Sequence, residues 1–515
     1  MHEPDSQTRD AAEHSERGSD PLSVAGLDRD LSRRSVRGGA FVMAGQGGSI
    51  LVGIASAAVL ARLLDPEDFG LVAMAGAFIV LLGEFADLGL SQATVQRREV
   101  TTAQVSTLFW VNVGLGAAAM LIGFALSWPI GLFYEDARLG PVAAALSIGF
   151  FFSGVAAQPL AVLRRRMRFA AETTVTLISL AVGLLAAIVA ALSGLGYWSL
   201  VVQTLATAAT RMAGMFIASG WMPSRPARAE GIREILRFGG YLSGSNLIAA
   251  VIRSIDKILV GRFVGADAAG LYSNAQRILL APVTQLNKPL TMVARPALAR
   301  LQDDPERFRA YYRRGIEVVA SASLPTIAVA VIMAGDLVRV VLGPGWDGVV
   351  PIFMALAPAG LLATLAVITT WVYVPLGRTD RQFRWICLQS IGVVAGMAIG
   401  LRYGAVGVAA GYSIAVACLR VPAIAWCLKG TFVRWSDVGS AIWRPLLATA
   451  VAAAAILAAG GAIASLEAPS ARLAIGALAF AAVYLVSFLA LPGGFARASA
   501  IVAMVRHLRP NPGNR

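Results

Sequence analysis

Apolar runs of roughly 18 or more residues recur along this chain from about Gly39 onward. Each run is long enough to cross the roughly 30 Å hydrocarbon layer of a bilayer as a helix. The composition agrees, because 57% of the residues are hydrophobic and only 14% are charged, against about 25% charged in a soluble protein. An ordinary soluble enzyme is therefore excluded. The sequence predicts an all-α, polytopic membrane protein.

The apolar runs are bounded by charged residues, Gly and Pro, and they predict about fourteen transmembrane helices. The expected spans are residues 39–61, 70–94, 104–130, 141–162, 172–193, 197–219, 238–260, 269–292, 316–335, 350–374, 385–401, 405–427, 441–464 and 471–491.

Alternate loops between these spans differ sharply in arginine content. The rich set includes residues 33–37, 164–168 and 300–314. The poor set holds little beyond Arg62, Arg138, Arg262, Arg402 and Arg472. Arginine-rich loops stay on the cytoplasmic side, so both termini are expected in the cytoplasm. The loops on the other side are too short for an external catalytic domain, and we expect no enzymatic activity.

The net charge of +14 comes from basic residues scattered in short loops. Nucleic-acid binding would need them gathered with aromatic residues on a soluble face, so we expect no nucleic-acid partner. The polar N-terminus, residues 1–32, lacks the apolar core of a signal peptide and is expected to be a disordered tail. The cysteines Cys387, Cys418 and Cys427 match no metal or redox spacing, and we expect structural thiols, with no metal and no cofactor.

Two of the cytoplasmic loops, residues 225–240 and 300–317, carry apolar residues at helical spacing beside a basic face. This pattern favours short helices lying at the inner membrane surface. Plain solvated connectors are the alternative.

The chain also contains internal sequence repeats, which we call echoes. Residues 60–71, "LARLLDPEDFGL", align with residues 260–271, "VGRFVGADAAGL", at an offset of 200 without a gap, pairing Arg62 with Arg262 and Gly70 with Gly270. Two further echoes follow in order, "RRRMRF" (164–169) with "RTDRQF" (378–383), and "GLGYW" with "RYGAV". They predict two parallel six-helix bundles followed by two extra helices.

The expected domains are accordingly a cytoplasmic tail at 1–32, an N-terminal bundle at 33–220, a cytoplasmic linker helix at 221–237, a C-terminal bundle at 238–428, and two additional helices with a basic tail at 429–515.

Several motifs resemble the polysaccharide flippase branch of the multidrug/oligosaccharidyl-lipid/polysaccharide exporter superfamily. They are "LLDPEDFGLVAM", "FADLGLSQATVQRREVT", "PLAVLRRRMRF", "GYWSLVVQ", "SIDKILVGRFVGADAAGLYSNAQRI", "LVRVVLGPGWDGVVPIF" and "PLGRTDRQFRW", and they cover about residues 33–430 in order.

The resemblance implies a V-shaped fold of two helical lobes. Its cavity would pass a polyprenyl-pyrophosphate-linked sugar chain from the cytoplasmic to the external leaflet of the bacterial inner membrane, for exopolysaccharide, capsule or O-antigen. It also implies membrane lipids and polysaccharide polymerase or export proteins as partners.

Charged side chains inside membrane spans are costly, so they usually face a wet cavity or a partner. In the seventh span Asn246, Arg253, Asp256 and Lys257 share one helical face. The eighth span adds Asn274, Gln276 and Arg277 near its outer end and Gln285, Asn287 and Lys288 near its inner end. We expect Arg253 and Arg277 to hold the pyrophosphate, because guanidinium groups contact phosphate with two parallel hydrogen bonds. Alternatively, Arg253 pairs with Asp256 or Asp267, and Arg277 reaches the membrane surface.

Other polar groups suggest coupling to H⁺ or Na⁺. Lysine loses its proton when desolvated, so Lys257 beside Asp256 is a candidate release switch. Glu84 and Asp87 share a face of the second span and are candidate ion-coupling residues, as is Asp256. A structural pairing of Asp87 with Arg97 or Arg98 is the alternative.

Two features are expected to be structural. Arg62 and Arg262 favour anchoring at outer helix ends over substrate contact. The glycines of "GQGGS" (45–49) favour close helix packing over phosphate binding.

The competing hypotheses are a drug or cation antiporter of the same superfamily and a non-transporting scaffold of a glycan assembly complex. An antiporter should show a cavity dominated by carboxylates, whereas arginines dominate the seventh and eighth spans.

Overall fold

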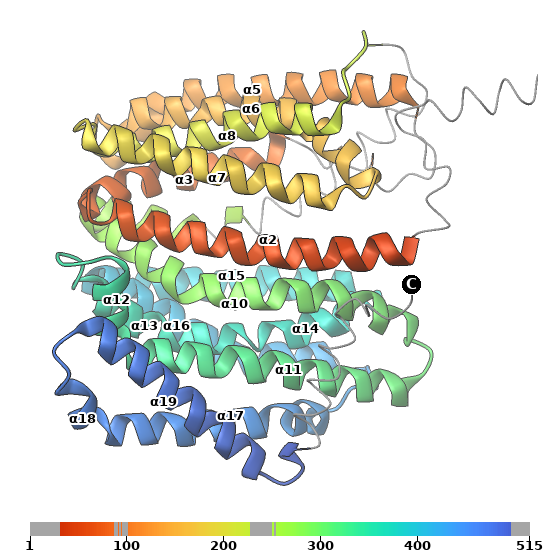
Figure 1. Cartoon of the computed structure of the whole chain (residues 1–515), viewed down its shortest axis with the longest axis vertical. Helices are drawn as coiled ribbons and strands as arrows, with labels where there is room; N and C mark the ends of the chain where they lie inside the picture. The colour runs from red at the N-terminus through yellow and green to blue at the C-terminus, as the bar shows by residue number, and fades with distance from the viewer. Residues whose placement is uncertain are drawn as a thin grey trace, which may run out of the picture. The chain divides into compact units, whose positions relative to one another are not determined.

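The regular elements that the structure describes are all helices (Figure 1). The computed structural model describes residues 31–86, 91, 94, 101–226, 250–251 and 254–495. Contacts between Cα atoms divide the chain into two compact units. Unit 1 holds the residues up to Gly53 and Ala75–Ser254, and unit 2 holds Ile54–Met74 and the chain from Ile255 to His507.

Two helices belong to both units, namely α2 (Leu31–Leu60) and α3 (Pro66–Ala86). Unit 1 also holds α5 (Thr102–Tyr134), α6 (Leu139–Arg165), α7 (Phe169–Leu192) and α8 (Trp198–Ser219). Unit 2 holds a helical segment at 255–263 followed by α10 (Ala266–Arg300), α11 (Pro305–Ile332), α12 (Ala334–Val341), α13 (Val349–Ala363), α14 (Ala366–Tyr373), α15 (Thr379–Gly400), η1 (Leu401–Tyr403), α16 (Gly404–Leu428), α17 (Trp435–Ala458), α18 (Gly460–Ala464) and α19 (Pro469–Ala490).

The prediction of an all-α, polytopic membrane protein is confirmed. Among the described residues, 10 helical stretches are long and apolar enough to cross a membrane, and one of them runs through α15 and α16 together. The expected number of fourteen is not confirmed, partly because residues 238–249 lie outside the described part. The short helix α12 was not expected from the sequence, since eight residues are too few to give an apolar run of membrane length.

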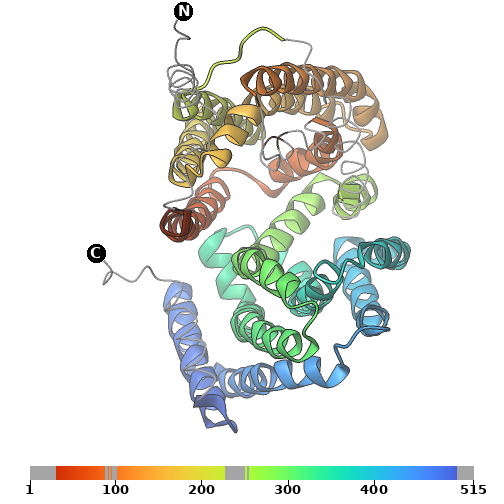
Figure 2. The ribbon, with the colours of Figure 1, turned by 90° about the vertical axis from the view of Figure 1, so that its right-hand side faces the viewer.

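Glycines set the close packing of the unit 1 helices, which Figure 2 shows nearly end-on. Gly116 of α5 and Gly154 of α6 face each other, so that a Cβ on either would lie 2.6 or 2.5 Å from a backbone oxygen of the opposite helix. In α2, a Cβ at Gly45 would lie 1.9 Å from Thr173 Cγ2 of α7, and Gly48 packs against Leu177. The expected packing role of "GQGGS" is therefore confirmed for these two glycines.

The arginine-rich turn 164–169 of unit 1 closes the end of α8. Arg166 and Arg168 donate hydrogen bonds to the carbonyls of Ser219 and Ala218, at 2.8 and 3.0 Å. The last carbonyls of a helix have no partner within it and carry partial negative charge. Cationic donors therefore stabilise this helix end.

The echoed turn of unit 2, residues 378–383, does the same for α16. Arg381 donates to the carbonyl of Trp426 at 2.9 Å, and Arg378 donates to the carbonyls of Lys429 and Gly430 just after the helix. Arg381 also lies over the Trp426 ring, 5.5 Å from its centroid. Two turns that resemble each other in sequence thus perform the same structural task in their own units.

The last two long helices, α17 and α19, are tied to unit 2 by buried polar contacts. Arg309 of α11 donates two hydrogen bonds to the Asp437 carboxylate of α17, at 2.8 and 3.0 Å. Arg472 of α19 pairs with Asp336 of α12 at 2.9 Å. Both ion pairs join the first turn of one of these helices to another element of unit 2. The helices therefore pack as part of unit 2.

Residues 300–317 differ from the expectation of a short helix at the membrane surface. Residues 305–317 are instead the first turns of α11, which starts at the N-cap Asp304 and continues to Ile332. Phe308 and Tyr312, read as the apolar side of a surface helix, are fully buried in a core cluster with Trp371. The sequence pattern of residues 305–317 is amphipathic because one side of these helical turns packs against the protein core. The other expected surface helix, 225–240, lies largely outside the described residues.

Candidate functional site

Helix α10 is the most polar long helix of unit 2. It has 35 residues, about 52 Å at 1.5 Å per residue, yet it is absent from the stretches apolar enough to cross a membrane. The sequence accounts for this, since Asn274, Gln276, Arg277 and Lys288 interrupt its apolar positions. A helix of this length and polarity among membrane helices indicates a water-filled or ligand-filled environment along one side.

The exposed face of α10 carries the cations. Arg277, Thr284 and Lys288 are exposed and stand 7 and 4 residues apart, which places them on one side of the helix. Arg277 follows the start of α10 by about 16 Å, and Lys288 precedes its end by about 18 Å. Both cations therefore belong to the middle of the helix and not to its ends, where long side chains reach the membrane surface.

A buried carboxylate lies beside the opposite side of α10. Asp256 is only 2% exposed. Its Oδ2 accepts a hydrogen bond of 2.7 Å from Gln276 Nε2, and its Oδ1 accepts one of 2.8 Å from the backbone N–H of Lys257. The side chain of Tyr272, one turn earlier on α10, is fully buried next to the same carboxylate. Asp256 therefore accepts hydrogen bonds from neutral donors and has the charge of Lys257 beside it.

Two groups of α16 extend this cluster. Tyr412 interacts electrostatically with Asp256, and Arg420 interacts with Tyr412. The Nε atom of Arg420 is buried and has no hydrogen-bond partner among the described residues. The arrangement links a buried carboxylate to a guanidinium through neutral polar groups from α10 and α16. Chemically it offers a place for a proton or a small cation at Asp256 and donors for an anion near Arg420.

The predicted site residues are only partly brought together. Gln276 contacts Asp256, and Lys257 is half-buried beside it. Asn274 is 2% exposed and donates to the Gly270 carbonyl of its own helix. Asn246, Arg253, Asp87 and the side chain of Glu84 lie outside the described residues, so their roles remain predictions.

Sequence reasoning missed Arg420 and a second arginine, Arg295 of α10, whose Nε is also buried without a partner in the described part of the chain. A signal was present for Arg420, because it interrupts the apolar run 405–427 from within. It was read as part of the span because a single arginine in so long a run barely lowers its hydropathy.

Arg62 has the expected anchoring role. It donates to the carbonyls of Val340 and Val341, at 2.8 and 3.2 Å, at the last turn of α12. Its symmetry mate Arg262 lies over the Phe263 ring, 5.9 Å from the centroid.

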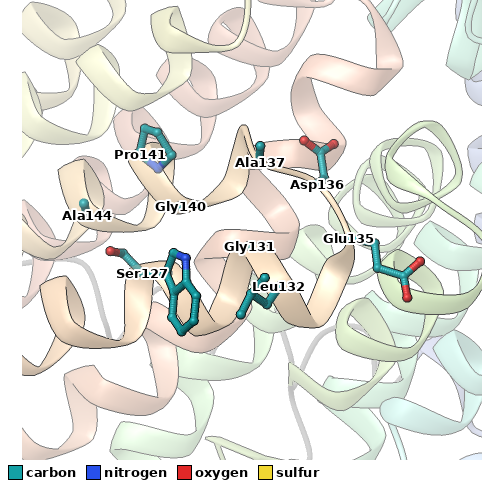
Figure 3. A pocket seen from close by; sticks show the side chains of 10 residues that line it. Ser127, Gly131, Leu132, Glu135, Asp136, Ala137, Gly140, Pro141 and Ala144 are labelled. Carbon is teal, nitrogen blue, oxygen red and sulfur yellow. The ribbon is translucent and has the colours of Figure 1, made fainter.

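A surface depression lies elsewhere, in unit 1. It has a volume of about 570 Å³ and is lined only by residues of the α5–α6 hairpin, including Trp128, Leu132 and Pro141 (Figure 3). None of the polar residues of 254–300 lines it. Of its two carboxylates, Glu135 and Asp136, Asp136 is paired with Arg138 at 2.8 Å. An apolar depression with an exposed Trp at a helix end is typical of a membrane-interface position.

The apolar helices of the described residues define a polytopic membrane protein. The structure is similar to the solved lipid II flippase MurJ in an inward closed conformation, with a TM-score of 0.70 at 14% identity, covering 89% of this chain and 99% of that one.

Comparison with known families identifies the chain more closely. Residues 59–351 match the family model described as polysaccharide biosynthesis protein, and the chain belongs to that family. It is 26% identical over 368 residues to the lipopolysaccharide biosynthesis protein WzxC of Escherichia coli (strain K12), covering 70% of this chain and 74% of WzxC. It is 26% identical over 352 residues to the succinoglycan biosynthesis transport protein ExoT of Rhizobium meliloti (strain 1021), covering 66% of this chain and 69% of ExoT. The resemblance drawn from the sequence motifs is confirmed.

Proposed function

We propose that this protein flips polyprenyl-pyrophosphate-linked oligosaccharide repeat units from the cytoplasmic to the external leaflet of a bacterial inner membrane. The units supply exopolysaccharide, capsule or O-antigen. Membership of the polysaccharide biosynthesis protein family and the similarity to a succinoglycan transport protein support this function. The fold shared with MurJ supports movement of a large lipid-linked substrate by alternating access between two helical units.

The observation that carries the proposal is the exposed cationic face of α10. Arg277 and Lys288 stand in the middle of a 35-residue helix, where a lipid-facing cation would cost about 2.5–3.5 kcal/mol. A water-filled path with an anionic cargo removes that cost. Arg277 and Arg253 would hold the pyrophosphate, because the planar guanidinium matches phosphate oxygens and stays charged at every relevant pH. Lys257, Asn246, Asn274 and Gln276 would contribute further polar contacts.

Transport is coupled to H⁺ or Na⁺ in this proposal, with Asp256 as the coupling carboxylate. Its support is a buried position with hydrogen bonds from neutral donors, where a bound proton or cation and the neighbouring Lys257 would compete to balance the carboxylate. Lys257 would release substrate by changing its charge. Glu84 and Asp87 are proposed as further coupling residues.

The remaining predictions complete the proposal. Both termini lie in the cytoplasm, and the six-helix bundles at 33–220 and 238–428 are the moving lobes, with the tail 1–32, the linker 221–237 and the helices of 429–515 attached. The protein performs no catalysis of its own. It works beside polysaccharide polymerase or export proteins, with membrane lipids and the lipid-linked oligosaccharide as its other partners.

The alternatives are a drug or cation antiporter and a non-transporting scaffold. The cations on α10 favour an anionic cargo over a cationic drug. A scaffold would need no cationic face inside a membrane helix.

Deletion of the protein tests the function directly. We expect surface polysaccharide to disappear while undecaprenyl-linked repeat units accumulate on the cytoplasmic side, as measured by lipid extraction and mass spectrometry. Arg253→Ala and Arg277→Ala should reproduce the block at normal expression. Arg307→Ala, which removes an arginine with a 79% exposed side chain, is the matched control and should restore surface glycan. Intact surface glycan in the deletion strain, or accumulation of a species without a lipid, would reject the flippase.

A further inference from the structure

The short helix α12 lies between α11 and the turn 342–348 that leads into α13. Its apolar side is buried in the protein, with Ala334 and Val338 3 and 0% exposed. A helix of eight residues is about 12 Å long. Each of its two ends contacts a different segment of unit 2, so α12 connects those two segments directly.

The first turn of α12 is held by α19. Arg472 of α19 donates from Nε to the Asp336 carboxylate at 2.9 Å, and both side chains are 21% exposed. One turn further along α19, a Cβ on Gly476 would lie 2.4 Å from Cε of Met333, the residue that precedes α12. Figure 1 shows the start of α19 beside α12. An ion pair and a close packing contact thus attach this end of α12 to α19.

The last turn of α12 is held by residues 54–74, the part of α2 and α3 that belongs to unit 2. Arg62 donates to the carbonyls of Val340 and Val341, at 2.8 and 3.2 Å. The final carbonyls of a helix have no partner within it and carry partial negative charge. The Arg62 guanidinium therefore stabilises this helix end and attaches it to residues 54–74.

Two further contacts pack residues 54–74 on unit 2. Trp346, in the turn after α12, is 1% exposed and donates from Nε1 to the Ala61 carbonyl at 2.8 Å. The backbones cross closely at Gly70, where a Cβ would lie 1.7 Å from the Ala266 oxygen. The position of α12 and of the turn after it thus decides whether Arg62 and Trp346 reach their partners.

The contacts at the two ends of α12 differ in what transport demands of them. The remaining length of α2 and α3 belongs to unit 1, whereas α12 and α19 both belong to unit 2. In the proposed alternating access, the outer ends of α2 and α3 leave unit 2 when the path opens outward. The contacts of residues 54–74 are then broken and remade in each cycle, while α12 stays with α19.

We propose that α19 positions α12 for its contact with residues 54–74 and thereby sets how readily the outer end of the protein opens. Arg472 and Asp336 are positioning residues, because they act on Arg62 through α12. Without their ion pair α12 shifts, and the closed outer end loses part of its stabilisation. The inference rests on the proposed transport function, and it gives α19 a role in transport beyond packing.

The rate of thiol labelling in nanodiscs tests this proposal. The background is a variant in which alanine replaces the three native cysteines. The reporter is Leu71→Cys, at a position that is 0% exposed and that a water-soluble maleimide reaches when residues 54–74 leave unit 2. A second reporter, Ala441→Cys in α17, is also at a position 0% exposed and becomes labelled when the protein unfolds.

Three kinds of variant separate the contact from its positioning. Arg62→Ala removes the contact itself and should raise the labelling rate at the Leu71→Cys reporter about tenfold. Asp336→Ala and Arg472→Ala should each raise it about fivefold. Arg472→Lys keeps a cation beside Asp336 and should stay within about twofold of the parent. Adding Asp336→Ala to Arg62→Ala should change the rate little, because both act on the same contact.

The matched control is Asp347→Ala, which breaks an exposed pair with Arg339 near the other end of α12 and should leave the labelling rate within about twofold of the parent. Parent-like labelling in both Asp336→Ala and Arg472→Ala would overturn the proposal, as would effects that multiply in the double variant. An equal rise at the Ala441→Cys reporter would assign the effect to unfolding and reject the proposal too. The labelling needs no substrate, so its failure is distinguishable from a failure of the flippase function in the deletion strain.

Discussion

The helices α8 and α16 begin within the two echoed stretches "GLGYW" and "RYGAV", and each carries one arginine within its apolar length. Arg211 follows Gly196 by 15 residues and Arg420 follows Gly404 by 16, and both glycines have positive φ, 53° and 68°. Arg211 lies within electrostatic reach of Glu172, which Arg164 also contacts at 2.7 Å. Arg420 has Tyr412 as its neighbour and a buried Nε without a partner in the described part of the chain.

The difference separates structural from functional charge. In unit 1 the cation has a carboxylate within electrostatic range, which it shares with Arg164. In unit 2 the neighbour of the corresponding cation among the described residues is the neutral Tyr412, and the carboxylate of its cluster, Asp256, accepts hydrogen bonds from neutral donors and lies beside Lys257. Leaving polar groups incompletely paired in a membrane is costly. We infer that unit 2 retains this cost because a ligand or ion completes the cluster during transport.

The largest expected effect is on a charge that is fully paired, Asp437. It is 1% exposed and accepts two hydrogen bonds from Arg309 and one from the backbone N–H of Arg434. Asp437→Ala should lower the free energy of unfolding by about 3 kcal/mol, because it leaves the Arg309 guanidinium without its partner. Thermal unfolding in detergent measures the change.

The control for this variant is Asp347→Ala, which breaks an exposed pair with Arg339 and should change stability by less than about 1 kcal/mol. The folded fraction of the Asp437→Ala variant should flip substrate at a rate near that of the parent protein. A stable Asp437→Ala variant that no longer flips substrate would contradict the division between balanced structural charges and unbalanced functional ones.

The next effect is on transport and compares the two arginines directly. Arg420→Ala should lower the flipping rate about tenfold, or about 1.4 kcal/mol in the activation free energy, with little change in thermal stability. Arg211→Ala should stay within about twofold of the parent. The measurement is flipping of a fluorescent polyprenyl-pyrophosphate disaccharide in proteoliposomes. Equal losses of flipping rate in both variants would show that transport requires the arginine of α8 as much as that of α16, whatever their partners are.

Much of the fold was predictable because membrane helices follow from local apolar length. The expected span 197–219 nearly coincides with α8, and 405–427 with α16. The echo of the arginine turns was predictable too. Cationic side chains stabilise the C-terminal ends of helices, and this favours arginine at the same place in both turns. The contact between Gly70 and Gly270 explains the echo of residues 60–71 with 260–271. A Cβ at either position would collide with a backbone oxygen of the other segment, so both positions require glycine.

The candidate site was less predictable because burial and pairing depend on distant segments. The sequence placed Gln276 among substrate-binding residues, whereas its amide donates to Asp256. It gave no weight to Arg420, which stands out because its buried Nε has no hydrogen-bond partner in the described part of the chain. The assignment of residues 54–74 to unit 2 could not be read from the sequence either, because it follows from contacts with residues far along the chain, such as Ala266, Val340 and Trp346.

The smallest expected effect concerns Asp136, in the turn between α5 and α6. Hydrogen bonds from the Arg138 side chain lower the pKa of this carboxyl, with the shortest ion-pair distance 2.8 Å. Because the folded-state pKa is depressed, the pair contributes stability above the unfolded pKa of about 3.9, and this contribution is lost as the pH falls through the folded value. The pair is partly exposed, so Asp136→Asn should cost less than about 1 kcal/mol at pH 7 and leave transport unchanged. Thermal unfolding of parent and variant between pH 7 and pH 3 measures the difference, which should shrink toward zero at the acidic end. A difference that persists at low pH, or a loss of flipping, would show that Asp136 acts through something other than its local pair with Arg138.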